Sequence, residues 1–443
     1  MTECSRETIT FSRLPQRRVV ADFAGGWLTS DAGLLLLREV DRRLGLSAAI
    51  DACLPDPRDP RYVLHEQQQM LAQRLFAVAA GYEDLNDHQT LRDDPALQTA
   101  TGKLPDPETP LASPSTLCRL EQRVTRQSLI EMSKLFVEIF LRSFEAPPAE
   151  IILDVDATDD PVHGQQEERF YHGYYRHYCF LPLYVFCGGH LLCALLRPAN
   201  IDPAKHSRAI IKLLVDRIRA EWPDVRIIVR GDSGFCRWKL MRWCEHHSVD
   251  YVFGLGRNSI LEQRIAPLMD QAEAAFGETG QKQRYFGETE YAAGTWDRSR
   301  RVIMKAERLL EGPNRRFVVT SLDMPPQSVY DEGYTPRGDM ENRIKEQQLM
   351  LFADRTSCHA FLANQFRLLL SSFAYVLLHH LRAEHLADTE LAPAQVDRLR
   401  LTLIKIAARV CVSARRVVFH LSSNCPYQSL FRAAAASLLL DTS

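Results

Sequence analysis

The sequence predicts an α/β fold with three parts: a mostly helical N-terminal region, a mixed β-sheet core interrupted by antiparallel strands, and a basic C-terminal tail. Three observations predict it. Residues up to about 148 show helical periodicity, short apolar runs then alternate with amphipathic stretches, and residues 258–322 alternate aromatic with polar side chains. The chain has 443 residues, 46% of them hydrophobic, which is enough for several domains around a buried core.

The N-terminal region is predicted to contain capped helices. Ser30 and Asp31 are candidate caps for a helix that ends at Gly45, a second helix runs from about Leu64 to Ala80, and a third starts at the cap Ser113. Arginines follow at positions 119, 123 and 126. Short helices carrying arginines are equally typical of a helix-turn-helix that binds DNA and of a plain helical domain.

The sheet core is predicted to begin after the linker Pro147-Pro148. Ile151–Asp156 is a short apolar run, and the runs 178–186 and 190–196 flank a Gly188-Gly189 turn, so we expect three consecutive strands ending in a hairpin. Further along, the pattern predicts a helix, a strand, a helix and a strand, at residues 204–221, 226–230, 238–247 and 251–255.

Residues 258–322 are predicted to form an antiparallel β insertion, and helices are expected at 338–352 and 361–382. The predicted organisation therefore has five segments. They are a helical DNA-binding domain at 1–148, a first core segment at 149–257, the β insertion at 258–325, a second core segment at 326–385 and a basic region at 386–443.

The balance of 54 basic and 56 acidic residues gives a net charge of −2, which excludes a basic surface over the whole chain. Charge is nevertheless uneven. From residue 398 to residue 432 the chain carries no acid and seven basic residues, at 398, 400, 405, 409, 415, 416 and 432. Together with the arginines at 119, 123 and 126, this tail is predicted to contact phosphates.

The eleven cysteines include no CxxC pair and no zinc-site spacing, which predicts reduced thiols. No signal peptide is apparent at the N-terminus. The apolar stretch Phe366–Leu381 contains an arginine, two serines and two histidines, so we expect a buried core helix and no membrane span. These observations predict a cytoplasmic protein.

Acidic residues follow two of the predicted strands. Asp154 and Asp156 lie two residues apart, so both project from one face of a strand, and Asp232 directly follows another apolar run. Aspartate inside a strand lowers stability, so its presence there indicates a function. In α/β sheets, ligands bind at the carboxyl ends of the strands, where these acids lie. For Asp232, a turn residue that caps the next helix is an equal alternative.

A third acid comes from the helix after the insertion. Helical spacing places five residues on one stripe: Tyr334, Arg337, Glu341, Lys345 and Gln348. A solvated face with a Glu341–Lys345 ion pair is the alternative. Three carboxylates could instead hold two divalent metals about 4 Å apart, as phosphodiester attack requires, and oxygen ligands favour Mg²⁺ or Mn²⁺.

At these residues the sequence resembles the DDE transposases of bacterial insertion sequences, in the group with the Tyr-x2-Arg-x3-Glu-x6-Lys signature. Tyr334, Arg337 and Glu341 match that spacing. Asp156-Ala157-Thr158 is similar to the first aspartate motif and Arg230–Phe235 to the second. The sequence departs from the signature at its last position, where Gln348 replaces lysine. Lys345, nearly one turn earlier, is the alternative lysine.

The resemblance implies an RNase H-like catalytic core with Asp156, Asp232 and Glu341 as catalytic residues and ligands of two Mg²⁺ or Mn²⁺ ions. It also implies binding to terminal inverted repeats, strand cleavage and transfer of the ends into target DNA, with cut-and-paste transposition through a hairpin. Asp154 remains the alternative first ligand.

The same resemblance implies DNA contacts by Tyr334, Arg337 and Lys345, a homodimer on double-stranded DNA, and action at the bacterial nucleoid. Trp296 is expected either to stack on a flipped base or to belong to the core of the insertion. Two other functions stay open: an RNase H-like nuclease without strand transfer, and a decayed transposase that only binds DNA.

Overall fold

The computed structural model describes residues 8–440, which divide into two compact units. The first unit combines residues up to 51, residues 56–120 and residues from 380 onward, and the second unit combines 52–55 with 121–379. This division differs from the five predicted segments. The C-terminal segment does not stand alone, because its strand β15 (Ala408–Val412) pairs with β3 (Leu28–Thr29) near the N-terminus.

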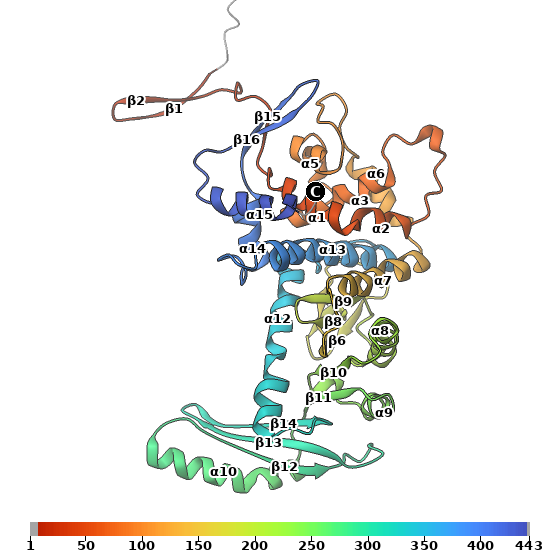
Figure 1. Cartoon of the computed structure of the whole chain (residues 1–443), viewed down its shortest axis with the longest axis vertical. Coiled ribbons are helices and arrows are strands. Elements are labelled where there is room, and N and C mark those ends of the chain that lie inside the picture. The colour runs from red at the N-terminus through yellow and green to blue at the C-terminus, as the bar shows by residue number, and fades with distance from the viewer. Residues whose placement is uncertain (1–7, 441–443) are drawn as a thin grey trace, which may run out of the picture. The chain divides into compact units, whose positions relative to one another are not determined.

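The second unit is built on an eight-stranded mixed sheet (Figure 1). In sheet order its strands are β12 (Gln283–Tyr291), β13 (Arg300–Leu309), β14 (Gly312–Thr320), β11 (Asp250–Leu255), β10 (Arg226–Gly231), β4 (Glu150–Ala157), β8 (Leu183–Cys187) and β9 (His190–Leu195). The three central strands, β4, β10 and β11, run parallel, and the remaining neighbours pair antiparallel. The predicted strands at 151–156, 226–230 and 251–255 and the hairpin at Gly188-Gly189 are confirmed.

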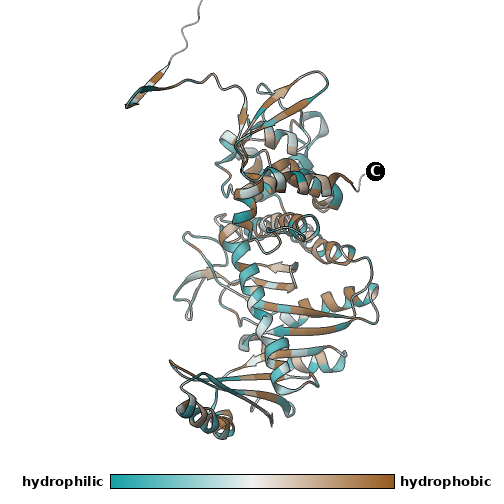
Figure 2. Cartoon of the chain, turned by 60° about the vertical axis from the view of Figure 1, so that its left-hand side comes forward, coloured by the Kyte–Doolittle hydropathy of each residue, from teal (hydrophilic) through white to brown (hydrophobic). Residues whose placement is uncertain are grey.

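Helices pack on this sheet through apolar stripes. They are α7 (Arg126–Arg142), α8 (Ser207–Glu221), α9 (Trp238–His246), α10 (Ser259–Thr279) and α13 (Phe361–His385). From α8, Ile211, Leu214 and Ile218 enter one hydrophobic cluster with residues of the central strands, as helical spacing at i, i+3 and i+7 requires. These strands carry mainly hydrophobic residues because the middle of the sheet is covered (Figure 2).

The predicted β insertion differs from the structure in two respects. Its first third is the 21-residue helix α10, which begins where the Asn258 side chain accepts a hydrogen bond from the Leu261 N–H. Its strands β12, β13 and β14 do form an antiparallel set, but β14 pairs with β11 and so extends the core sheet. Buried residues such as Val318 and Val319 explain the extension, since neither face of β14 could be left in water.

A continuous helical stretch with changing winding follows the sheet (Figure 1). Its parts are α11 (Pro326–Ser328), the π-helical η3 (Val329–Tyr334), the 3-10 turn η4 (Thr335–Arg337), α12 (Gly338–Lys345) and the π-helical η5 (Glu346–Met350). Pro336 lies in η4, where the missing N–H breaks regular α-helical hydrogen bonding. Tyr334 ends η3, so it is helical, as the predicted stripe requires.

Between β4 and β8 lies a small sheet, which we call the flap (residues 158–182). Its strands are β5 (Asp160–Pro161), β6 (Phe170–His172) and β7 (His177–Phe180), in the order β5-β7-β6. The sequence predicted one strand over 178–186. The structure divides that run into β7 and β8 at Leu181-Pro182, because Pro182 has no N–H to continue a ladder.

The first unit is mainly helical, with two small sheets. Its elements are α1 (Leu34–Leu44), α2 (Leu46–Ala52), η1 (Pro60–Tyr62), α3 (Gln67–Ala80), α4 (His88–Leu91), α5 (Pro95–Ala100), α6 (Pro114–Gln122), α14 (Val396–Leu399), η6 (Arg400–Ile404), α15 (Gln428–Leu440), the exposed hairpin of β1 (Ile9–Leu14) and β2 (Arg17–Ala21), and the sheet β16-β15-β3 with β16 (Val417–Leu421). The predicted ends of α1 and α3 at Gly45 and Gly81 are confirmed, and both glycines are left-handed.

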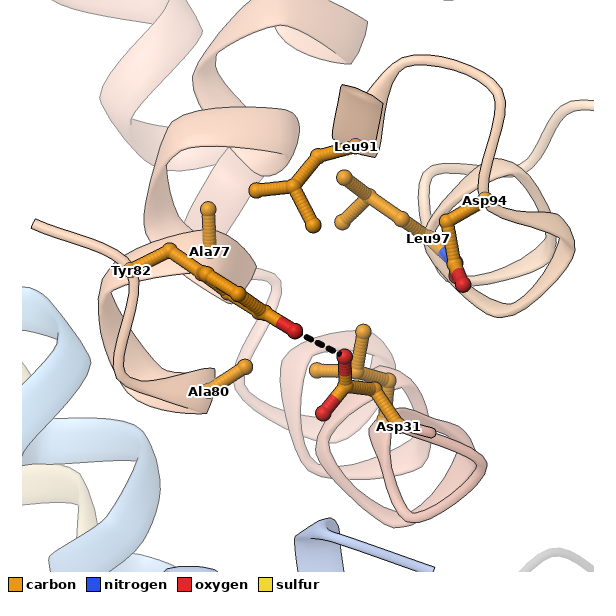
Figure 3. Close-up of a pocket in the computed structure, with 8 residues that line it drawn as sticks. Asp31, Ala77, Ala80, Tyr82, Leu91, Asp94 and Leu97 are labelled. Carbon is orange, nitrogen blue, oxygen red and sulfur yellow. Dashed lines mark hydrogen bonds between the residues drawn. The ribbon is translucent and has the colours of Figure 1, made fainter. Parts of the chain in front are cut away.

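The predicted cap of α1 is wrong, because Gly33 occupies the cap position without a side-chain hydrogen bond. Asp31 instead accepts a hydrogen bond of 2.6 Å from the Tyr82 hydroxyl (Figure 3) and forms an ion pair of 2.7 Å with Lys405. A buried carboxylate needs such partners. The network joins distant parts of the sequence within the first unit.

This pairing corrects part of the predicted phosphate-binding tail. Lys405 forms its ion pair with Asp31. The guanidinium of Arg400 donates a hydrogen bond to the carbonyl of Ala79, and burial lowers the pKa of Arg400 to about 10. The other tail arginines are exposed, at positions 398, 409, 415, 416 and 432. They remain predicted phosphate contacts, as do the exposed Arg119 and Arg126.

Among residues 8–440, α13 alone is long and apolar enough to cross a membrane, but 83% of its most apolar stretch is buried. That burial agrees with the predicted core helix. The ten cysteines in the same range are free thiols, half of them buried, while Cys4 lies outside the described residues.

Candidate active site

The parallel register of β4 and β10 places Arg230 directly beside Asp154. The guanidinium forms a two-pronged ion pair with this carboxylate, at 2.5 Å from Nε to Oδ1 and 2.8 Å from Nη2 to Oδ2. Its Nη1 donates to the carbonyl of Gly333 at 2.9 Å. Both oxygens of Asp154 are thus engaged by a buried cation, which leaves Asp156 as the available acid on this strand.

Asp156 and Asp232 lie at the carboxyl ends of neighbouring parallel strands. Burial, and next the charge of Asp232, raise the pKa of Asp156 to about 7. Asp232 also caps the 3-10 turn η2 (Ser233–Phe235), accepting a hydrogen bond of 2.8 Å from the Gly234 N–H. Asp232 therefore caps a turn, as its alternative role predicted, and also lies near Asp156.

Arg337 lies between the two acids that come from different elements. One guanidinium nitrogen is 3.4 Å from Oδ2 of Asp156, and the other is 2.7 Å from Oε1 of Glu341. Glu341 thus forms its ion pair with Arg337, one turn toward the N-terminus, where the alternative had paired it with Lys345. Glu341 is exposed and Asp156 is half-buried, so Arg337 connects a solvent-facing acid with an enclosed one.

Tyr334 approaches the same group of residues over Gly254 of β11. A Cβ atom at Gly254 would lie 2.7 Å from the Tyr334 hydroxyl and 3.0 Å from the backbone nitrogen of Ser233. A glycine is therefore required for this contact. Burial raises the pKa of Tyr334, Arg337 opposes that rise, and Asp232 adds to it, which puts all three groups near one another.

The carboxylates suit a hard divalent cation by their chemistry, because all of their donors are oxygens. Burial and the neighbouring charge of Asp232 raise the pKa of Asp156, and a bound cation would offset both costs of ionising this carboxyl. Across residues 8–440, no three His, Cys, Asp or Glu side chains meet closely enough to hold one ion. In this site the side chain of Arg337 separates Glu341 from Asp156.

Residues 11–441 match the family model described as Transposase DDE domain group 1. The chain belongs to this family of DDE transposases. It is therefore an enzyme that acts on DNA, and divalent metal ions are the general cofactors of such transposases. No curated protein matches the sequence.

Among solved structures, the transposase is similar to one titled "Cryo-EM structure of piggyBac transposase synaptic complex with hairpin DNA". The two share 10% sequence identity, with a TM-score of 0.41. The match covers 85% of this chain and 79% of the other.

The signature's last position has a structural role in this transposase. The amide of Gln348 donates to the carbonyl of Asp159 at 2.8 Å, so it links the helical stretch to the base of the flap. Lys345 is exposed on the same stretch, three residues earlier. Its predicted contact with DNA stays a prediction.

Trp296 of the transposase packs against protein. Its ring meets Tyr291 edge-on with centroids 5.6 Å apart, and the Arg300 guanidinium lies 5.6 Å from its centroid. The side chain is partly buried against the main hydrophobic cluster, as its alternative role in the core requires. The base-stacking role of Trp296 stays a prediction.

Sequence reasoning missed three features around this site. Arg230 belongs to the second aspartate motif, but the sequence does not predict its role, because its pairing with Asp154 depends on strand register. Gly254 was seen only as a strand residue. The aromatic sequence of the flap, from Arg169 to Tyr178, was a local pattern that could have been noticed.

Proposed function

We propose that this transposase serves a bacterial insertion sequence, in the cytoplasm of its host. It binds the element's terminal inverted repeats, cleaves DNA there and transfers the ends into target DNA. The observation that carries the proposal is the meeting of Asp156 and Asp232 at the ends of parallel strands, with Glu341 connected to them through Arg337.

An RNase H-like core is included in this proposal. This part of the sheet has the strand order β9-β8-β4-β10-β11. On one side of β4, β8 pairs antiparallel with β4 and β9 pairs antiparallel with β8, and on the other side β10 and β11 run parallel to β4. This arrangement supports such a core. Asp156 then lies at the end of the first strand of that core and Asp232 directly after the fourth, at the edge where α/β sheets bind ligands.

Asp156, Asp232 and Glu341 would hold two Mg²⁺ or Mn²⁺ ions. Such ions lower the pKa of an attacking water or hydroxyl and stabilise the leaving oxygen of a phosphodiester. Arg337 and Tyr334 would bind the phosphates beside the cleaved bond. A guanidinium presents paired N–H donors that match phosphate oxygens, and Arg337 already lies between two of the acids.

A homodimer on double-stranded DNA and a cut-and-paste pathway through a hairpin complete the proposal. A time course of Mg²⁺-dependent cleavage on end-containing DNA, scored for hairpin strands, tests the pathway. Supplying pre-cleaved ends and a supercoiled target tests strand transfer, because a nuclease without transfer yields no joined product.

The roles of the acids are tested by Asp232→Ala. We expect cleavage of end-containing DNA to fall by roughly 1,000-fold or more, since acids that act as a unit are each needed. Binding to the terminal repeats should persist. The matched control is Asp224→Ala, an exposed aspartate just before β10, which should cleave normally. Cleavage by Asp232→Ala at the wild-type rate would contradict the assignment.

A further inference from the structure

The flap carries three large aromatic side chains on its surface. Tyr171 is 57% exposed, Tyr174 83% and Tyr178 47%. The small core under the flap is made of Cys179 and Leu181 with Ala199 from beyond β9, and Phe170 and Tyr175 pack against it. The three exposed tyrosines lie outside this core.

Two of these rings form a pair, and the third stands in the β6–β7 turn. Tyr171 and Tyr178 are cross-strand partners in β6 and β7, with centroids 5.7 Å apart, and Tyr174 meets Tyr175 at 5.1 Å. The guanidinium of Arg169 lies over the ring of Tyr178, 4.6 Å from its centroid. Arg176 is exposed at the tip of the β6–β7 turn. Aromatic faces next to guanidinium groups suit nucleic-acid bases and the phosphates between them.

The flap is attached directly to the active site. Its first strand starts at Asp160, four residues after Asp156. Burial raises the pKa of Tyr175 to about 12, and the carboxylates of Asp159 and then Asp156 add to the rise, so this ring lies within electrostatic reach of the acid. At its base, the Asp159 carbonyl accepts the hydrogen bond from Gln348.

We propose that the flap binds unpaired nucleotides of the DNA substrate by stacking their bases on Tyr171, Tyr174 and Tyr178, with Arg169 and Arg176 facing the backbone. The proposal rests on the proposed function, and it adds the form of DNA that the enzyme holds beside the cleaved bond. Unpaired bases are the fitting ligand because the faces of bases inside a duplex are already covered by their neighbours.

A binding measurement without divalent metal tests this proposal. The probes are a fluorescein-labelled oligodeoxythymidylate and a blunt mixed-sequence duplex. Tyr174→Ala and Tyr178→Ala should each weaken binding of the single strand by about 10-fold and leave duplex binding unchanged. Tyr174→Phe and Tyr178→Phe should bind as the wild type does, because stacking needs the ring and not the hydroxyl.

The matched control is Tyr62→Ala in the first unit. Tyr62 is 80% exposed and has Arg61 beside its ring, so it shares the chemistry of the flap tyrosines but not their location. Its removal should change neither affinity. Single-strand binding that is unaltered in Tyr174→Ala and Tyr178→Ala would overturn the proposal.

A second measurement uses the unmodified protein and so does not depend on the folding of a variant. Photo-crosslinking of an oligonucleotide containing 5-iododeoxyuridine should label the peptide from 169 to 178. Labelling confined to other peptides would overturn the proposal. Neither experiment requires cleavage, so a failure here is distinct from a failure of Asp232→Ala to lose cleavage.

Discussion

At the scale of single residues, Arg230 holds together more of the active site than any acid does. Its guanidinium bonds both oxygens of Asp154 on β4 and the carbonyl of Gly333 on the helical stretch, while its backbone belongs to β10. These three elements carry Asp156, Asp232 and Glu341. The geometry of the acids therefore depends on a residue that touches none of them.

Arg230→Met should destabilise the second unit by about 3–5 kcal/mol, because it leaves a buried carboxylate without its cation. Urea unfolding followed by tryptophan fluorescence measures the change. The double variant Asp154→Asn with Arg230→Met should recover at least half of the loss, since no buried charge then remains unpaired. Equal stabilities for Arg230→Met and the wild type would show that the pair is not buried in solution.

At the scale of elements, the ring of His88 at the start of α4 is enclosed against α3. It lies between two donors, the side-chain amide of Gln73 and the guanidinium of Arg74, and the neutral ring can accept a hydrogen bond from one of them. Burial, and then the charge of Arg74, lower the pKa of His88 to about 3. The folded first unit thus requires the neutral imidazole.

This requirement makes the stability of the first unit depend on pH. Above pH 6.5 His88 is neutral in both the folded and the unfolded state. Below that pH the unfolded state binds a proton at His88, whereas the folded state binds one only near pH 3. His88 should therefore cost about 2 kcal/mol of stability between pH 7.5 and pH 5. Urea unfolding at both values checks this. In His88→Gln the difference should shrink by that amount, and an unchanged difference would contradict it.

Local patterns predicted many elements of the sheet and its helices. The alternation in Ile151–Asp156, the turn at Gly188-Gly189 and the helical stripe of α8 are visible in short windows, because each depends on neighbouring residues. The three acids and Arg337 were also found in this way. That Asp156 and Asp232 lie at neighbouring strand ends depends on pairing between distant strands, which no short window contains.

What sequence reasoning could not predict depends on long-range pairing or on competition between partners. The pairing of β14 with β11 turned a predicted insertion into an extension of the core sheet. Asp31 has the side chain of a helix cap, but Tyr82 and Lys405 take its carboxylate. The helix α10 was missed even though Asn258 is a suitable cap, because the aromatic residues after it dominated the pattern.

At the scale of the whole molecule, a net charge of −2 is compatible with DNA binding because a total near zero leaves room for local groups of basic residues. Arg415 and Arg416 are exposed in the turn between β15 and β16, and Arg409 is exposed on β15. This group can meet phosphates while acids elsewhere balance the total. The near-neutral charge weakens indiscriminate binding and leaves specific contact open.

Binding to end-containing DNA should therefore weaken steeply with salt. Replacing Arg415 and Arg416 by glutamine should reduce the slope of log K against log salt by about 2, since each phosphate contact contributes roughly 0.9. Fluorescence anisotropy over a salt series measures the slope. Lys134→Gln, on an exposed face of α7, is the control and should keep it. A salt-independent affinity for the wild type would contradict the role of this surface.

The pairing of β3 with β15 also determines when the first unit can finish folding during synthesis. Thr29 leaves the ribosome early, and its partner Ala408 appears only several hundred residues later. The first unit must wait for that segment, and closing so long a loop slows its folding. Any expression fragment or premature stop before residue 408 leaves β3 without its neighbour. A shortened version of this enzyme should therefore keep the segments of both strands.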